Sequence, residues 1–303
     1  MNSALIKRLF KRTIPFLPGY HSICLVLQKH RLKEWEWIDR TPVKPGILVL
    51  VHSIVGDFYM SRPERCSIAK KYFWTQGVRE PVEDRIALNL FACLSKYSNA
   101  VLDIGANSGL FSIVAAKSNP EAEIMAFDIL PEAYHVLIDN LLINNLLERV
   151  EIELVGIGVG GGVFFAPFND ISSEMPSSLS LDCKPKYSDQ VEVPIKSLDE
   201  ICLPRFFGKK LLIKIDVEGT EIDIFSHGRE TLKVIKPDII CEVLPGARRF
   251  DVYDQILDEC LYRKYLITNG GLQLFNSIKP DIRFKDWFFT TKNNIDIEEL
   301  LKQ

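Results

Sequence analysis

Five carboxylates in this chain each follow closely on an apolar run that predicts a β-strand. They are Asp103, Asp128, Asp216, Glu218 and Glu242. In a parallel sheet with intervening helices, ligands bind beyond the carboxyl ends of the strands. Carboxylates placed there could accept hydrogen bonds from a ligand, take a proton as a general base, or hold a hard cation. Any one of them could equally be a solvated surface charge or favour the start of the following helix.

The stretch from residue 99 to 116, NAVLDIGANSGLFSIVAA, supplies a candidate ligand-binding loop. It predicts a short strand over 100–102, a turn that contains Gly105 and Gly109, and a helix that begins near Leu110. Glycine has no Cβ, so such a turn lets backbone N–H groups approach a bound ligand closely. A strand, a turn and a helix can also follow one another in an α/β protein without binding anything.

A dinucleotide-binding loop is one interpretation of this stretch, because such proteins place an acid near the position of Asp128 to contact a ribose. The GxGxxG pattern of dinucleotide loops is absent, since residues 105–109 read GANSG. In addition, Asp103 ends the strand before the first glycine. These two departures favour a different nucleotide-like ligand.

The elements around the loop predict the fold. Strands are expected over 47–51, 58–60, 123–129, 150–159, 211–217, 237–244 and 287–290, and helices over 84–96, 131–145, from about 220, and over 251–263. The NGG stretch at 269–271 lies between two apolar runs and predicts a hairpin. Residues 160–190 are rich in Gly, Ser and Pro and predict a loop. Alternating strands and helices predict an α/β fold with a doubly wound, mostly parallel sheet, helices on both faces and an antiparallel C-terminal strand.

Size and composition limit the class of protein. The chain has 303 residues, of which 47% are hydrophobic and 25% charged, which suits one large α/β domain or a domain with an extension. A formal net charge of -3 gives no global basic field, so a nucleic-acid partner is disfavoured. The seven cysteines form no CxxC pair, as is typical of free thiols in a reducing compartment. With no apolar run near the roughly 18 residues of a membrane span and no signal-peptide core, we expect a cytoplasmic protein.

The N-terminal region differs from the rest in its charge. The first 33 residues carry seven Lys or Arg and no acid, and apolar pairs alternate with basic pairs over 5–12. A helix there would have one apolar and one basic face. It could lie peripherally on the inner, anionic membrane surface, or it could pack on the main domain with its basic side in water. We expect residues 1–45 to form a basic N-terminal extension and residues 46–303 to form the main domain.

From about residue 77 to 243, the order of motifs resembles the FkbM-type family of S-adenosylmethionine-dependent methyltransferases. The matching stretches are GVREPVE (77–83), VLDIGANSGLFS (101–112), AFDILPEA (126–133), NLLINNLLERV (140–150), VEVPIKSLDEI (191–201), KIDVEGTEIDIFSHG (214–228) and IICEV (239–243). The KIDVEGTE block, found in order behind DIGAN, is the most specific of these. The resemblance implies a class I, Rossmann-like methyltransferase domain over residues 46–303.

The same resemblance implies S-adenosylmethionine as methyl donor and, most often, O-methylation of a sugar, glycolipid, polysaccharide or other small natural product. Carried over by position, the residues that would bind the donor are Asp103, Gly105, Ala106, Asn107, Gly109 and Asp128. Among them, Asp103 would lie near the amino group of the donor and Asp128 would accept hydrogen bonds from its ribose. The implied partner is a small-molecule or saccharide acceptor.

Asp216 and Glu218 are the predicted catalytic residues. A hydroxyl is a poor nucleophile until its proton is removed or polarised, so a base or a metal ion must supply that activation. Together with Glu221, these carboxylates could bind a divalent cation, which is therefore a second candidate cofactor. Alternatively, Glu221 favours the first helical turn and only Asp216 faces the site.

Two other functions stay open at this stage. A non-catalytic nucleotide-binding or scaffold module could keep the same fold, and it is supported by GIGVGGG at 156–162, where Val159 replaces an acid that many relatives place near the adenine. A nucleic-acid methyltransferase is disfavoured, because the (D/N)PP(Y/F) block is missing after the predicted strand at 211–217 and because the net charge is acidic.

Overall fold

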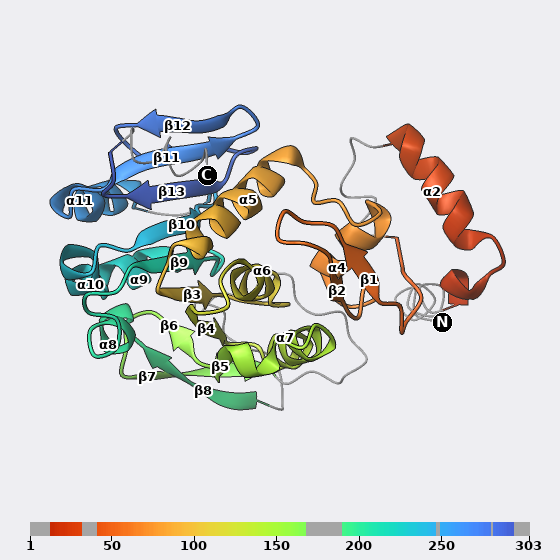
Figure 1. The fold of residues 1–303 in the computed structure, drawn as a ribbon, viewed down its shortest axis with the longest axis horizontal. Coiled ribbons are helices and arrows are strands. Elements are labelled where there is room, and N and C mark those ends of the chain that lie inside the picture. Colours follow the sequence, from red (N-terminus) through yellow and green to blue (C-terminus); the bar gives the residue numbers. More distant parts are fainter. Residues whose placement is uncertain (1–12, 32–40, 168–189, 247–248, 280, 294–303) are drawn as a thin grey trace.

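An eight-stranded sheet forms the centre of the molecule (Figure 1). The computed structural model describes residues 13–31, 41–167, 190–246, 249–279 and 281–293. The strands of the large sheet are β3 (Ala100–Ile104), β4 (Glu123–Asp128), β5 (Val150–Leu154), β9 (Leu211–Ile215), β10 (Asp238–Glu242), β11 (Arg263–Thr268), β12 (Gly271–Phe275) and β13 (Asp286–Thr290). Their order is β12-β11-β13-β10-β9-β3-β4-β5.

The strand directions confirm the predicted sheet. The pairs β3–β4, β4–β5, β3–β9 and β9–β10 are parallel. The C-terminal strand β13 is antiparallel to both of its neighbours, β10 and β11. The predicted hairpin is also present, since β11 and β12 pair in antiparallel fashion on either side of the turn. The order runs outward in both directions from the β3–β9 pair, which places a topological switch point between these two strands.

Helices cover both faces of this sheet, as the predicted class requires (Figure 1). One face carries α5 (Val82–Lys96), α6 (Leu110–Ser118) and α7 (Pro131–Ile143), and the other carries α8 (Leu198–Cys202), α9 (Glu221–Ser226), α10 (Arg229–Val234) and α11 (Phe250–Glu259). Successive strand side chains point to opposite faces. Accordingly Val101, Leu212 and Ile240 belong to the core under α5–α7, whereas Leu102 and Ile213 belong to the core on the other side.

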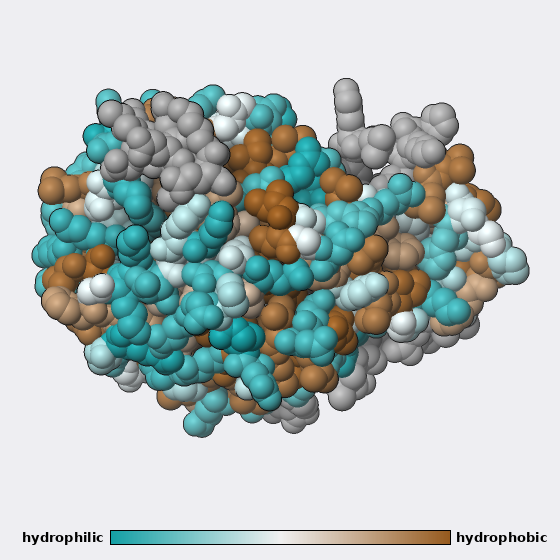
Figure 2. Space-filling model, in the orientation of Figure 1, coloured by the Kyte–Doolittle hydropathy of each residue, from teal (hydrophilic) through white to brown (hydrophobic). Residues whose placement is uncertain are grey.

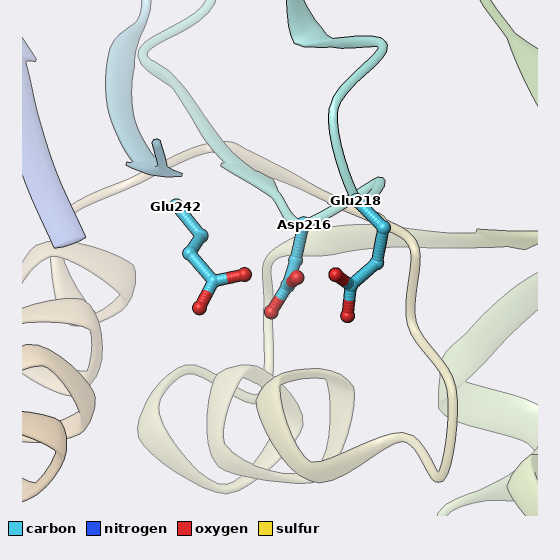
Figure 3. A group of neighbouring side chains, drawn as sticks. All are labelled: Asp216, Glu218 and Glu242. Atoms are coloured by element: carbon cyan, nitrogen blue, oxygen red, sulfur yellow. The ribbon is translucent and has the colours of Figure 1, made fainter. Parts of the chain in front are cut away.

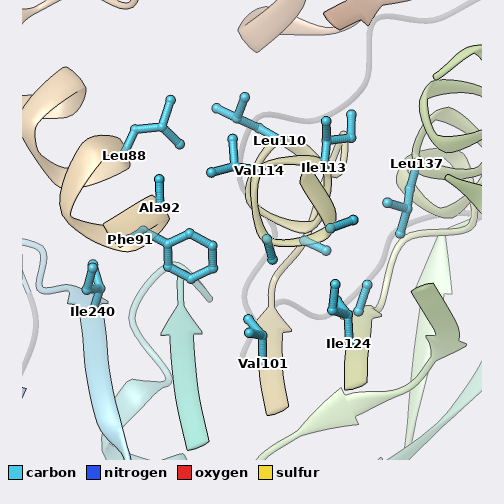
Figure 4. Packing of buried hydrophobic residues seen from close by; sticks show 14 of the residues in the cluster. Leu88, Phe91, Ala92, Val101, Leu110, Ile113, Val114, Ile124, Leu137 and Ile240 are labelled. Carbon is cyan, nitrogen blue, oxygen red and sulfur yellow. The ribbon is translucent and has the colours of Figure 1, made fainter. Parts of the chain in front are cut away.

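The first of these cores fixes the helix that follows the glycine turn. Figure 4 shows Phe91 of α5 and Val114 of α6 above Val101 and Ile240 of the sheet. All four side chains are 0–1% exposed. Burial of this much apolar surface holds α6, and with it the end of the glycine turn, in a fixed position relative to β3.

A second, three-stranded sheet changes two of the predictions. Its strands are β6 (Gly156–Ile157), β7 (Gly162–Pro167) and β8 (Gln190–Lys196), in the order β6-β8-β7. The predicted strand over 150–159 is therefore divided, because the chain leaves the large sheet after Leu154 and pairs with β8 from Gly156. The predicted loop over 160–190 is wrong in its first part, because β7 buries Phe164 and Ala166 and exposes the alternate side chains. Residues 168–189 lie outside the described part of the chain.

The N-terminal part packs beside the main sheet. It contains η1 (Ile14–Phe16), α2 (Tyr20–Arg31), β1 (Val49–Val51), β2 (Phe58–Met60) and α4 (Ser67–Trp74). Elsewhere in the chain, a short helix, η2 (Leu147–Arg149), precedes β5. The predicted early strand pair is confirmed, because β1 and β2 are antiparallel. The helix predicted over 5–12 lies outside the described residues, and the proposed boundary near residue 45 stays a prediction. Among the described residues, no helix is long and apolar enough to cross a membrane.

Candidate active site

A cavity of about 440 Å³ opens at the carboxyl ends of β3, β4, β9 and β10. All five acids singled out from the sequence line it: Asp103, Asp128, Asp216, Glu218 and Glu242. Gly105, Ala106 and Asn107 of the predicted loop also line it, whereas Gly109 lies behind it at the start of α6. A cavity of this size is in the usual range for a small-molecule or cofactor site.

Two glycines of the loop have a left-handed backbone and little space for a side chain. Gly105 has φ +80°, and a Cβ there would lie 1.9 Å from the backbone oxygen of Asp216 on the neighbouring strand end. Gly109 has φ +78°, and a Cβ there would lie 2.2 Å from Cδ1 of Leu137. Both positions have a left-handed backbone that favours glycine, and at Gly105 the close approach is to backbone, which leaves no room for a side chain. The turn is consequently packed directly against the end of β9 and against α7.

Asp103 is a buried acid at the end of β3. It is 1% exposed, and its Oδ2 accepts hydrogen bonds from the backbone N–H of Ser112 (2.9 Å) and from the Ser112 hydroxyl (2.6 Å). Burial raises the pKa of the Asp103 carboxyl to about 6, although the Ser112 hydrogen bonds and the charge of Lys214 oppose this rise. The other oxygen has no hydrogen bond within the described structure, and Asp103 lines the cavity.

Asp128 is held more rigidly at the end of β4. Its Oδ2 accepts from the backbone N–H of Asn107 (2.7 Å), and its Oδ1 accepts from that of Leu130 (2.8 Å). Burial raises the pKa of this carboxyl to about 6 as well, again against the effect of its hydrogen bonds. Each oxygen keeps a second lone pair, so a ligand with two neighbouring hydroxyls could still donate to Asp128.

Three carboxylates gather at the ends of β9 and β10 (Figure 3). One oxygen each from Asp216, Glu218 and Glu242 lies within 4.8 Å of the others. Burial, together with the carboxylates of Asp216 and Asp286, raises the pKa of Glu242 to about 9. This raised pKa favours the protonated form of Glu242, which would relieve repulsion within the cluster. Glu218 has φ +57°, an uncommon backbone for a residue other than glycine, and such strain is typical of functional sites.

Lys214 lies beneath this cluster. Its side chain is 2% exposed, and its Nζ lies 3.6 Å from Asp216 Oδ2, 3.4 Å from Asp286 Oδ1 and 5.1 Å from the centre of the Phe111 ring. Burial alone would lower the pKa of the ammonium, but the nearby carboxylates, of which Asp216 contributes most, raise it above its usual value. The carboxylates thus favour the charged form of Lys214, which pairs with Asp216 and Asp286 at this edge of the sheet.

The carboxylates that could form a cation site differ from those predicted. Glu221 is fully buried, its Oε1 accepts from the backbone N–H of Gly219 (2.8 Å), and its Oε2 accepts from the Tyr253 hydroxyl (3.2 Å). It lies outside the cavity, so the grouping of Asp216 and Glu218 with Glu221 is wrong. Glu242 takes that place instead, because the adjacent strand β10 ends beside β9.

A further group of charged residues that lines the cavity was not predicted from the sequence. Arg79 pairs with Asp84 (2.9 Å) and Arg283 pairs with Glu83 (3.2 Å), and all four residues line the cavity. Lys285 Nζ also lies 3.9 Å from Glu242 Oε1. These charges come from the start of α5 and from the segment before β13, which lie far apart in the sequence. One available signal was Lys214 itself, because a lysine inside the apolar run LLIKIDV requires buried partners.

The described residues fit the donor that the loop suggests. Two buried carboxylates, a glycine turn that a Cβ would block and an acidic cluster all line the cavity. Acids suit a ligand that carries an ammonium group, ribose hydroxyls and a sulfonium charge. Val159, the residue expected near the adenine, is 57% exposed and does not line the cavity, whose lining after β5 consists of Val155, Gly156 and Ile157.

Known proteins resemble this chain in sequence. The model of the "Methyltransferase FkbM domain" matches residues 103–264. The chain is 31% identical over 160 residues to "Methyltransferase sdnD" of Sordaria araneosa, which covers 48% of this chain and 60% of that protein. It is 26% identical over 224 residues to "2-O-methyltransferase NoeI" of Sinorhizobium fredii (strain NBRC 101917 / NGR234), covering 70% and 85% respectively. It thus spans about three fifths of the first relative and most of the second.

Solved structures resemble the chain at low sequence identity. A methyltransferase FkbM from Methylobacillus flagellatus KT has a TM-score of 0.42 and 16% identity, covering 64% of this chain and 43% of that one. An O-methyltransferase from Bacillus cereus in complex with SAH has a TM-score of 0.41 and 14% identity, covering 70% and 80% respectively.

Proposed function

This chain belongs to the FkbM methyltransferase family, and from that premise we propose that it transfers the methyl group of S-adenosylmethionine to a hydroxyl of a sugar, glycolipid, polysaccharide or other small natural product. The observation that carries the proposal is the single cavity in which the glycine turn, Asp103 and Asp128 face the acidic cluster. Methylation at oxygen is supported by the name of one relative, a 2-O-methyltransferase.

The proposed roles follow from the position of each side chain. Asp103 and the turn at 105–107 would hold the amino-acid end of the donor, and Asp128 would hold its ribose. When bound, the donor supplies an electrophilic methyl group on a positively charged sulfur. Asp216 would accept the proton of the acceptor hydroxyl as general base, with Glu218 as the second candidate. Lys214, whose Nζ lies 3.6 Å from Asp216 Oδ2, would orient the Asp216 carboxylate.

A divalent cation is a further part of the proposal. Asp216, Glu218 and Glu242 could supply three oxygen ligands to a hard cation, which would displace the proton of Glu242. Chelation followed by addition of magnesium or manganese tests this. Activity that disappears on chelation and returns with the metal supports the cation, whereas full activity after exhaustive chelation removes it and leaves activation to a general base, Asp216 or Glu218.

The proposal also includes partners and location. The acceptor would be a small molecule or a saccharide and not a nucleic acid, and the protein would act in the cytoplasm, in peripheral contact with the inner membrane surface. The six cysteines in the described part of the chain are free, which supports a reducing compartment. Charged groups that converge on one end of the cavity support an acceptor with several hydroxyl groups, because carboxylates and guanidinium groups bind such molecules through hydrogen bonds.

Titration with the donor and an assay of turnover together test the function. Isothermal titration should show binding of S-adenosylmethionine, and S-adenosylhomocysteine should accumulate only when a suitable acceptor is added. The substitution Asp216→Asn should keep donor binding and abolish turnover, whereas Glu121→Gln, at an exposed carboxylate outside the cavity, should change neither. Binding without turnover over a broad panel of hydroxylated acceptors would favour the alternative, a non-catalytic nucleotide-binding or scaffold module. An absence of donor binding would overturn the proposal.

A further inference from the structure

An unusual group of exposed apolar side chains lies on η1 and α2. It consists of Phe16, Leu17, Ile23 and Val26, which are 58–60% exposed, and we refer to it as the α2 surface. Figure 2 shows apolar residues over this part of the molecule, at the end away from α11. Single exposed apolar residues are ordinary, but several together on one short segment mark an interaction site.

The opposite face of α2 already has its partner. Tyr20, Cys24 and Leu25 pack in a small cluster with Val43 and Trp74. Ile23 and Val26 are three residues apart, so they share a face that points away from this cluster. The helix therefore has apolar side chains on two opposite sides, and the protein covers only one of them. A helix that only needed to pack on the domain would carry polar residues outward.

A basic side chain lies beside the α2 surface. Lys44 Nζ lies 5.4 Å from the centre of the Phe16 ring. The first 33 residues of the sequence contain seven Lys or Arg and no acid, and among the described residues 13–31 and 41–56 there is no carboxylate side chain. Apolar side chains beside a lysine, in described segments without a carboxylate, match the boundary between acyl chains and anionic headgroups of a bilayer.

We propose that the α2 surface docks this protein on an anionic lipid bilayer, with Phe16, Leu17, Ile23 and Val26 inserted at the headgroup boundary. This inference goes beyond the proposed methyl transfer and does not depend on it. It has a consequence for the cavity, because α4 packs on the inner face of α2 and also lines the cavity. Ser67, Ile68 and Lys71 of α4 line the cavity, while Phe73 and Trp74 at its end contact His21 of α2. Docking through α2 would thus bring that wall of the cavity close to the lipid, where a lipid-linked acceptor could reach it.

Sedimentation with vesicles tests the proposal on the full chain. Phosphatidylcholine vesicles with and without phosphatidylglycerol provide the two surfaces. We expect the protein to sediment with the anionic vesicles, and added salt should weaken this binding. The double substitution Ile23→Ser and Val26→Ser should lower the vesicle partition coefficient by on the order of tenfold, because two apolar side chains no longer insert. Replacement of Lys7, Arg8, Lys11 and Arg12 by serine should remove the dependence on phosphatidylglycerol.

A matched control separates this surface from general hydrophobicity. Phe207 and Leu261 are 73% and 75% exposed on other parts of the molecule. The double substitution Phe207→Ser and Leu261→Ser should leave the partition coefficient unchanged, and circular dichroism should show that both variants are folded. Equal sedimentation of the wild type and the α2 variant would overturn the proposal. A dimer in light scattering that the α2 substitutions dissociate, without any vesicle binding, would assign the surface to a second copy of the chain instead.

Discussion

Asp103 and Asp128 are equally perturbed in pKa but are bound in different ways. Both are buried, and burial raises both pKa values to about 6. Asp103 receives its hydrogen bonds on one oxygen, from the N–H and hydroxyl of Ser112. Asp128 receives one N–H on each oxygen, from Asn107 and Leu130. An amide can replace the first carboxylate without losing a bond, but it cannot replace the second.

Two isosteric substitutions test this difference. Asp103→Asn removes a buried charge while its Oδ1 still accepts from Ser112, so we expect the free energy of unfolding to rise by about 1–2 kcal/mol. Asp128→Asn places an NH₂ group against a backbone N–H, so we expect the free energy of unfolding to fall by about 1–3 kcal/mol. Both should weaken donor binding. Thermal unfolding and titration calorimetry measure the two effects, and a loss of stability in Asp103→Asn would contradict the assigned hydrogen bonds.

The pKa values of these two acids also predict opposite pH dependences for binding and stability. Donor binding requires the carboxylates, so affinity should be full well above pH 6 and should fall as the pH drops through 6. Both native-state values lie above the unfolded value near 3.8, so protonation favours the folded, unliganded protein. These two groups should therefore make that protein more stable as the pH falls from 7 toward 4. Calorimetry across this range checks the first trend, and an affinity independent of pH down to 5 would count against it.

Residue types and spacing predicted the acids of the site but not their counter-charges. Asp103, Asp128, Asp216 and Glu218 all line the cavity, because each ends a parallel strand and these ends meet at one edge. The pairing of Asp286 with Lys214 was not predicted. It reaches Lys214 only because β13 inserts between β10 and β11 and runs antiparallel to them, and nothing in the local sequence specifies that pairing.

At the scale of elements, the sequence predicted the strands of the large sheet better than the second sheet. Long apolar runs such as LLIKIDV are buried on both faces and give a strong signal. The strand β7 begins within the glycine run at 160–162, and its partner β8 follows only after residues 168–189, so its pairing was not visible locally. The division of the strand predicted over 150–159 has the same cause, since β6 pairs with β8 and not with β4.

Asn140 of α7 and Asn144, the residue that follows α7, both bond to residues at the early strand pair. Only Asn140 also bonds to the glycine turn. Asn140 is fully buried; its Nδ2 donates to the Ser108 carbonyl of the glycine turn (2.8 Å), and its Oδ1 accepts from the N–H and hydroxyl of Ser61 (both 2.7 Å). Asn144 lies one turn later and bonds only to backbone groups of Tyr59 and Asn140. Asn140 thus links the end of β2 to the glycine turn, whereas Asn144 links β2 only to α7.

We therefore expect Asn140→Ala to weaken donor binding and Asn144→Ala to leave it unchanged. Asn140→Ala leaves buried groups of Ser61 and Ser108 without partners, which costs about 2–4 kcal/mol of stability, whereas the exposed bonds of Asn144 contribute about 1 kcal/mol. Calorimetric titration with S-adenosylmethionine, carried out well below the melting temperature of each variant, compares them. If both variants lost affinity equally, the loop would depend on the general stability of α7 and not on the bond to Ser108.

Across the whole molecule, the parts differ in how many buried contacts hold them in place. Two large cores, one on each face of the sheet, bury most of the apolar side chains of the described residues. The helix α2 is attached through a separate small cluster with Val43 and Trp74 and through a hydrogen bond from the Tyr20 hydroxyl to the Pro42 carbonyl (3.2 Å). Regions with few buried contacts open locally at a lower free energy than the global unfolding of the protein. The proposed docking surface therefore lies on the part of the described structure that detaches most easily.

Hydrogen exchange should show this difference directly. We expect the amides of α2 to exchange through local opening, well before those of β3 and β9, which should exchange only with global unfolding. Leu25→Ala removes apolar contacts from the small cluster alone, so it should speed exchange in α2 by about tenfold or more and leave the rates in β3 and β9 unchanged. If anionic vesicles cover the outer face of α2, they should slow its exchange in the wild type. Protection of α2 equal to that of the central strands, without vesicles, would mean that α2 is an integral part of the main core.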